Sequence, residues 1–234
     1  MKSEKTEQAD HIRNVYAGRD ARGLRDRYAW FNADAVEREC SVKASVASIL
    51  YKAFGPNLEG LRVLDVGCGT GAFLRQLADW GASPETMIGT ELLPDRIDTA
   101  VRLSPSSVTW HLGNINELDL DLKFDLVSLF TVLSSVVDAD ERLNLIDEAW
   151  QRVDSLGWLL VFDLRVNNPA NHDVSRVKIT ELEHEVVPTS RYVNTLVLAP
   201  PLARRVTSLS RTLARILEAL PFFRTHFIYI AQKP

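Results

Sequence analysis

The chain contains 234 residues with a formal net charge of −4, and 46% of its residues are hydrophobic. This length suits one α/β domain with additions, and the acidic balance argues against a nucleic-acid partner. Because Cys40 and Cys68 are the only cysteines, we expect no structural disulfide and a reducing compartment. We find neither an apolar signal-peptide core nor a transmembrane segment of roughly 18 apolar residues, so we expect a cytoplasmic protein.

Hydrophobic patterning predicts helices and strands that alternate along most of the chain. Residues 1–27 are charged and weakly patterned, whereas residues 33–54 show helical spacing that ends at Gly55-Pro56. Strands are predicted at 63–66, 86–90, 108–112, 124–130, 158–162, 192–198 and 226–232, and helices at 72–78, 94–102 and 140–153. The first five strands and their helices predict a doubly wound, Rossmann-like α/β sheet.

Residues 199–225, between the last two predicted strands, are too long for a hairpin and are expected to be helical at their centre. The apolar face of this helix would carry Val206, Leu209, Leu213, Ile216, Leu217 and Leu220. The opposite face would carry Arg204, Arg211 and Arg215, with Arg205 to the side. An ordinary solvated face is one interpretation, and contact with anionic lipid headgroups or a phosphorylated acceptor is the other.

A glycine-rich turn follows the first predicted strand. Gly67, Cys68, Gly69 and Gly71 lie between that strand and a helix, which is how open α/β sheets build nucleotide sites. The dinucleotide fingerprint has the spacing Gly-x-Gly-x-x-Gly, whereas this turn has Gly-x-Gly-x-Gly. Asp65 precedes it, and a carboxylate there would repel a phosphate and attract an ammonium group. We therefore expect S-adenosylmethionine, a nucleoside with an amino-acid tail and no phosphate.

Further cofactor contacts are predicted at the carboxyl ends of the next strands. Glu91, twenty residues after Gly71, is placed to accept both ribose hydroxyls, and Leu92 to pack on the adenine. Asn114 and the backbone of Ile115 are placed to contact the adenine edge, although Asn114 also suits a simple turn. Phe130 and Thr131 end the fourth strand and begin a loop expected to face the methyl group.

Three aromatic residues gather in Arg27–Asn32. They suit either the sealing of one end of the core or a lid over the cofactor, because a sulfonium cation is attracted to aromatic faces. In the lid interpretation Tyr28, Phe31 and Asn32 contact the cofactor.

The series Asp65-x-Gly67-x-Gly69-x-Gly71, Glu91, Asn114 and Phe124-Asp125 resembles the ordered motifs of class I S-adenosylmethionine-dependent methyltransferases, over about residues 60–165. The resemblance implies a seven-stranded sheet of order 3-2-1-4-5-7-6 with strand 7 antiparallel. It departs from the family at Asn114, where many relatives carry Asp. Arg27–Asn32, Arg165–Pro169 and Leu198–Arg205 also resemble a bacterial subgroup found in polysaccharide or glycan gene settings.

The resemblance also implies how the chain is divided. Residues 1–55 would form an N-terminal helical lid, and residues 56–234 the cofactor-binding core. The insert 199–225 would then lie over the active site as an acceptor cap. The implied reaction is in-line methyl transfer from S-adenosylmethionine to a small-molecule or glycan acceptor, expected at oxygen, which leaves S-adenosylhomocysteine.

A hydroxyl acceptor needs a base, and an anionic or lipid-linked acceptor needs an anchor. Candidate bases are His226, His172, His184 and Asp163, each of which also suits a structural role. Arg165, at the end of the fifth strand, is the candidate anchor for a carboxylate or phosphate.

A metal site is not expected, because the loop after the fourth strand offers no carboxylate for magnesium and two cysteines do not make a zinc site. Two other functions stay open. The chain is alternatively an NAD-dependent oxidoreductase on a similar sheet, or a non-catalytic protein that keeps the cofactor fold.

Overall fold

The computed structural model describes residues 32–119, 121–167 and 173–234. Tyr28, Phe31 and His172 therefore lie outside the described residues. The chain divides into two compact units, and the larger contains residues 51–193 and 228–234. Of the described chain, the smaller unit contains residues 32–50 and 194–227.

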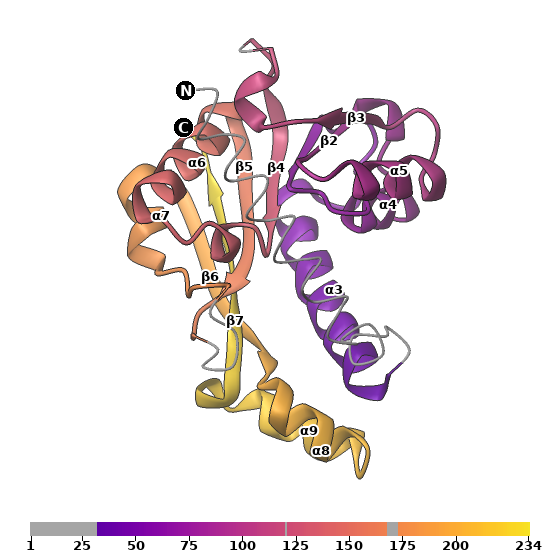
Figure 1. Cartoon of the computed structure of the whole chain (residues 1–234), viewed down its shortest axis with the longest axis vertical. Coiled ribbons are helices and arrows are strands. Elements are labelled where there is room, and N and C mark those ends of the chain that lie inside the picture. Colours follow the sequence, from indigo (N-terminus) through magenta and orange to yellow (C-terminus); the bar gives the residue numbers. More distant parts are fainter. Residues whose placement is uncertain (1–31, 120, 168–172) are drawn as a thin grey trace. The chain divides into compact units, whose positions relative to one another are not determined.

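A seven-stranded sheet of order β3-β2-β1-β4-β5-β7-β6 organises the fold (Figure 1). The strands are β1 (Val63–Val66), β2 (Met87–Glu91), β3 (Thr109–Leu112), β4 (Phe124–Phe130), β5 (Val153–Leu164), β6 (Ser190–Leu198) and β7 (Arg224–Gln232). The first five strands pair in parallel. Backbone hydrogen bonds join Thr189 to Gln232 and Ala199 to Phe223, so β7 runs antiparallel to its neighbours. The predicted fold and strand order are confirmed.

The central strands are apolar because helices cover the sheet on both faces. All four residues of β1 are buried, and Leu126, Val127 and Leu129 of β4 are fully enclosed. The helices of this unit are α4 (Ala72–Asp79), α5 (Pro94–Leu103), α6 (Ala139–Arg152) and α7 (Ile179–Glu185). In Figure 1, α4 and α5 lie beside β2 and β3, whereas α6 lies beside β5 and α7 packs on α6.

Strand β5 begins five residues earlier than the apolar run predicts. It follows α6 directly at Val153, and its pairing with β4 shifts register between Phe124 and Leu126. Leu156 lies in this irregular stretch with a φ of 63° and is 68% exposed. The apolar pattern therefore marks only the regular part of the strand.

In the smaller unit, the expectation of one amphipathic helix in the insert is wrong. The insert forms two helices, α8 (Pro200–Thr207) and α9 (Arg211–Ala219). The chain turns between them because the Ser210 hydroxyl accepts a hydrogen bond from the Leu213 amide at 3.2 Å and caps α9. Val206 and Ala214 are buried, whereas Leu209 is 84% exposed and Ile216 is 58% exposed. The expected apolar face is therefore split into a buried part and an exposed part.

Arg142 fastens the segments that follow β4 and β5. Its side chain, 4% exposed, donates to the Val136 carbonyl at 2.8 and 2.9 Å, to the Arg176 carbonyl at 3.1 Å and to Glu181 at 3.0 Å. It also bonds to the Ser175 hydroxyl. These segments start at the carboxyl edge of the sheet, so the hydrogen bonds of Arg142 fix the positions of the loops that border that edge.

We expect Arg142→Met to lower the free energy of unfolding by about 3–5 kcal/mol, because it leaves Glu181 and several buried carbonyls without their donor. Arg62→Met is the matched control. Arg62 is 46% exposed and pairs with Asp125 and Asp154 at the surface, so the loss there should stay within about 1 kcal/mol. Urea unfolding measures both, and equal losses would show that Arg142 does not fasten these segments.

Candidate functional site

The glycine-rich turn lies at the carboxyl end of β1, in the larger unit. Gly67, Gly69 and Gly71 have φ values of 63°, 56° and 75°, a left-handed conformation that glycine adopts without a side-chain clash. The turn is also closely packed. A Cβ atom at Gly67 would lie 2.7 Å from Val132, and one at Gly71 would lie 2.5 Å from Trp110. The turn therefore needs glycine for its conformation and for its close contacts.

Asp65 lies beneath this turn, and the residue is 2% exposed. The register pairs it with Ser128 of β4, whose hydroxyl donates a hydrogen bond to Asp65 Oδ1 at 2.7 Å. Burial raises the pKa of Asp65 to about 7, the Ser128 hydrogen bond opposes that rise, and the charge of Glu91 adds to it. A cation brought against Asp65 would favour the ionised form.

Glu91 ends β2 and is 6% exposed. Its Oε2 accepts a hydrogen bond from the Gly69 amide at 3.1 Å, and its Oε1 accepts from the amides of Leu92 and Leu93 at 2.7 and 3.0 Å. Arg96 of α5 approaches Oε2 at 3.5 Å. Glu91 therefore ties the glycine turn to the end of β2 as well as offering carboxylate oxygens to a ligand.

Three backbone amides of the turn already donate hydrogen bonds within the protein. The Cys68 amide donates to the Thr90 carbonyl and the Gly71 amide to the Cys68 carbonyl, both at 2.9 Å, while the Gly69 amide donates to Glu91. Burial raises the pKa of the Cys68 thiol far above neutrality, so the thiol stays protonated. Three backbone donors of the turn are therefore already used, and the carboxyl groups of Asp65 and Glu91 are the acidic groups beside it.

Asn114 follows β3 and forms a turn, which was the alternative to its predicted contact with adenine. Its Oδ1 accepts a hydrogen bond from the Ile115 amide at 2.8 Å. That oxygen has a second lone pair, whereas the Ile115 amide is already used. Ile115 itself is buried and its carbonyl accepts from Arg152 at 3.1 Å.

An aromatic cluster stands at the end of β4. The Phe130 ring lies 4.3 Å from Phe73 of α4 and 5.8 Å from Phe162 of β5, between ring centroids. Thr131 follows with a φ of 56°, held by its amide donating to the Phe162 carbonyl at 2.7 Å. A threonine in this conformation is strained, a feature that gathers at functional sites.

Sequence reasoning missed several residues of this site: Phe73, Arg96, Ser128 and Phe162. Ser128 carried a signal, since it is the polar residue inside the apolar end of β4 and the parallel register sets it beside Asp65. The two phenylalanines carried none, because phenylalanine is common in any core.

The candidate bases differ in environment. His226 belongs to the smaller unit, where its Nδ1 lies 2.9 Å from the Thr225 hydroxyl, and burial together with Arg38 lowers its pKa to about 4. His184 is 71% exposed beside Glu185. Asp163 is fully buried and accepts from the amides of Ser134 and Leu164. His226 is therefore neutral at physiological pH, and Asp163 positions the loop after β4.

Two other predicted residues are described. Arg165 follows β5 and is half-buried. Asn32 lies in the smaller unit, where its carbonyl accepts from the Val36 amide and starts α3 (Ala33–Phe54). Within the described ranges, no three His, Cys, Asp or Glu side chains gather to hold a metal.

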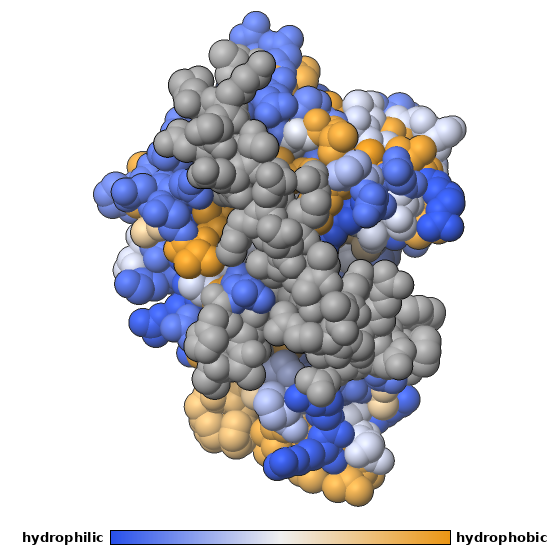
Figure 2. Space-filling model, viewed as in Figure 1, coloured by the Kyte–Doolittle hydropathy of each residue, from blue (hydrophilic) through white to orange (hydrophobic). Residues whose placement is uncertain are grey.

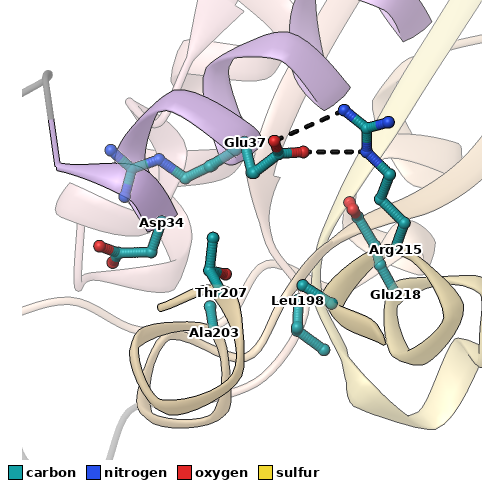
Figure 3. Close-up of a pocket in the computed structure, with 9 residues that line it drawn as sticks. Asp34, Glu37, Leu198, Ala203, Thr207, Arg215 and Glu218 are labelled. Carbon is teal, nitrogen blue, oxygen red and sulfur yellow. Dashed lines mark hydrogen bonds and ion pairs between the residues drawn. The ribbon is translucent and has the colours of Figure 1, made fainter. Parts of the chain in front are cut away.

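The smaller unit contains a small pocket lined by residues of α3 and of the insert (Figure 3). Glu37 of α3 pairs there with Arg215 at 3.0 Å and approaches Arg211 at 3.7 Å. Glu218 accepts from the Ser41 hydroxyl at 2.6 Å and the Val197 amide at 3.0 Å. These contacts fix one face of α9 against α3.

We expect Asp65→Asn to stabilise the ligand-free protein at neutral pH and not at acidic pH. The folded state holds the Asp65 proton up to about pH 7, whereas the unfolded chain releases it near pH 4, so ionisation costs stability as pH rises between these values. The variant should match the parent near pH 4 and exceed it by up to about 4 kcal/mol above pH 7.

Asp125→Asn is the control with the opposite sign. Burial alone would raise the pKa of Asp125, but hydrogen bonds from Arg62 lower it overall, so this variant should lose stability at neutral pH and converge with the parent in acid. Urea unfolding across this range measures both. A pH-independent effect of Asp65→Asn would contradict the burial of a protonated carboxyl.

Comparisons with known proteins identify the family and the fold. A family model described as a methyltransferase domain matches residues 37–193. Ubiquinone biosynthesis O-methyltransferase from Azorhizobium caulinodans is 33% identical over 129 residues, which cover 51% of this chain and 49% of that protein. The match thus spans about half the length of this curated relative.

Solved structures share the fold at low identity. Magnesium protoporphyrin IX methyltransferase from Synechocystis PCC 6803, with bound S-adenosylhomocysteine, matches with a TM-score of 0.63 and 16% identity over 97% of this chain and all of that chain. N-methyltransferase NodS from Bradyrhizobium japonicum WM9, in complex with the same compound, matches with a TM-score of 0.61 and 16% identity over 89% and 91%. Because the family model covers more than half of the sequence, the chain belongs to the methyltransferase family that its motifs resemble.

Proposed function

We propose that this chain is an S-adenosylmethionine-dependent methyltransferase that methylates an oxygen atom of a small-molecule or glycan acceptor. The observation that carries the proposal is a glycine turn packed against two carboxyl groups, those of Asp65 and Glu91. A dinucleotide site needs free turn amides to bind phosphate, whereas the Gly69 amide here is held by Glu91. A phosphate beside the buried Asp65 would raise the cost of ionising that carboxyl further, whereas a cation would lower it. The same groups suit a ligand that presents an ammonium group and ribose hydroxyls.

The residues present fit this cofactor. Of the three left-handed glycines, Gly69 has open space beside it, because a Cβ there would meet only an Arg96 nitrogen, at 3.7 Å. Asp65 would bind the ammonium group and Glu91 the ribose hydroxyls, while the second lone pair of Asn114 is open to the adenine amino group. The cluster of Phe73, Phe130 and Phe162 offers aromatic faces to a cation. When bound, the sulfonium would supply an activated methyl group, so the protein mainly orients the reactants and excludes water.

Oxygen as the methylated atom is supported by the similarity to ubiquinone biosynthesis O-methyltransferase. A hydroxyl acceptor must lose a proton, and His226 is the proposed base because its ring is neutral at physiological pH. Since its pKa is about 4, the ring must pass the proton on to solvent at once. Arg165 is proposed to hold an anionic group, a carboxylate or a phosphate, of the acceptor. A lipid-linked acceptor is compatible with the same anchor.

Calorimetry with S-adenosylhomocysteine and with NAD tests the cofactor. We expect the homocysteine compound to bind and NAD not to bind. Glu91→Gln should weaken S-adenosylhomocysteine binding at least tenfold, because a neutral amide both frees the glycine turn and accepts the ribose hydroxyls less strongly. Glu85→Gln, an exposed residue of the same chain, should leave the affinity unchanged.

Binding of NAD without binding of the homocysteine compound would overturn the cofactor assignment. Transfer of a labelled methyl group into extracts from the source organism tests the reaction itself. Labelled product from which ether- or ester-specific cleavage releases the methyl group supports oxygen methylation. Cofactor binding without any labelled product would instead favour a non-catalytic protein.

A further inference from the structure

The insert carries exposed apolar side chains on α9 and on the turns at both of its ends. Leu213, Ile216 and Leu220 are 44%, 58% and 40% exposed, and their spacing places them on one stripe. Leu209 in the preceding turn and Phe222 in the following one are 84% and 72% exposed. We call these five residues the apolar face. In Figure 2, apolar residues gather beside hydrophilic ones over α8 and α9.

The apolar face stays exposed to solvent, because the opposite side of α9 is held against α3. Arg215 pairs with Glu37, and Glu218 accepts from Ser41, so that side of the helix packs on α3 (Figure 3). Ala214 packs with Leu198 and Val206 in a small apolar cluster. The helix therefore keeps its buried contacts while it presents the apolar face to solvent.

The charge around the apolar face is positive. Residues 199–225 carry five arginines and one glutamate, a formal net charge of +4, whereas the whole chain carries −4. Arg204 and Arg205 are exposed, and neither forms an ion pair with a described residue. Arg211 and Arg215 share Glu37 yet remain 63% and 69% exposed. Arg224 is engaged by backbone carbonyls, including those of Glu218 and Thr195.

We propose that the apolar face and its arginines form a docking surface for a membrane that contains anionic lipids. Apolar side chains on a helix, with arginines beside them, enter the boundary between headgroups and acyl chains, and a basic segment is drawn to an anionic leaflet. A second copy of this face would oppose the first with like charge. Among the described helices none is long and apolar enough to cross a bilayer, so the proposed contact is with the surface. It does not depend on the proposed reaction.

Flotation of the full chain with vesicles tests this surface. The chain should float with vesicles that contain phosphatidylglycerol, less with phosphatidylcholine alone, and less at high salt. Leu213→Ser, Ile216→Ser and Leu220→Ser together should lower binding at least tenfold. Arg204→Gln with Arg205→Gln should lower it on the anionic vesicles only, and these exposed changes keep the test valid if the first variant misfolds.

Val101→Ser with Val187→Ser is the matched control, since these side chains are 55% and 71% exposed elsewhere on the surface. It should bind vesicles as the parent does, and thermal unfolding verifies that every variant is folded. Flotation that neither variant of the insert reduces would overturn the proposal. Absence of vesicle binding, with self-association that the triple serine variant abolishes, would overturn it in favour of a contact between copies.

Discussion

A carboxyl group buried under a left-handed glycine turn is the constraint on which the site depends. Asp65 is placed there by β1, and the parallel register supplies Ser128 as its hydrogen-bond donor. Burial makes the ionised form costly, so the ligand-free fold carries a penalty at neutral pH. A bound cation offsets that penalty, which links the stability of the fold to the ligand it selects.

The second carboxylate, that of Glu91, also disfavours a phosphate ligand. Glu91 occupies the Gly69 amide that a phosphate-binding turn would leave free. The same open sheet that elsewhere binds dinucleotides thus presents two acidic groups at its carboxyl edge. Arg142 and Asp163 hold the segments after β4 and β5 that border this edge. The acidic groups beside the glycine turn and the residues that hold the bordering segments therefore belong to different parts of the larger unit.

Much of the fold was readable from the sequence, because a parallel sheet buried on both faces leaves continuous apolar runs with glycine at the turns. Spacing alone predicted that Asp65, Glu91 and the three glycines lie at the carboxyl ends of β1 and β2, and the structure has them there. The break between α8 and α9 was not, because Leu209 fits a continuous helix until Ser210 caps the next one. The partners Ser128 and Arg96 depend on register and packing, which the linear pattern does not contain. The residues proposed to act on the acceptor, His226 and Arg165, were chosen only by their positions along the chain, because no motif distinguishes them.

Proton release on cofactor binding tests the central claim most directly. Calorimetric titration with S-adenosylhomocysteine, in buffers of different ionisation enthalpy, measures it. If the ammonium group ionises Asp65, whose pKa is about 7 in the free protein, binding should release about half a proton at pH 7, nearly one at pH 6 and almost none above pH 8. Asp65→Asn should remove this release. Binding with no proton release at pH 6, or with proton uptake, would contradict the account.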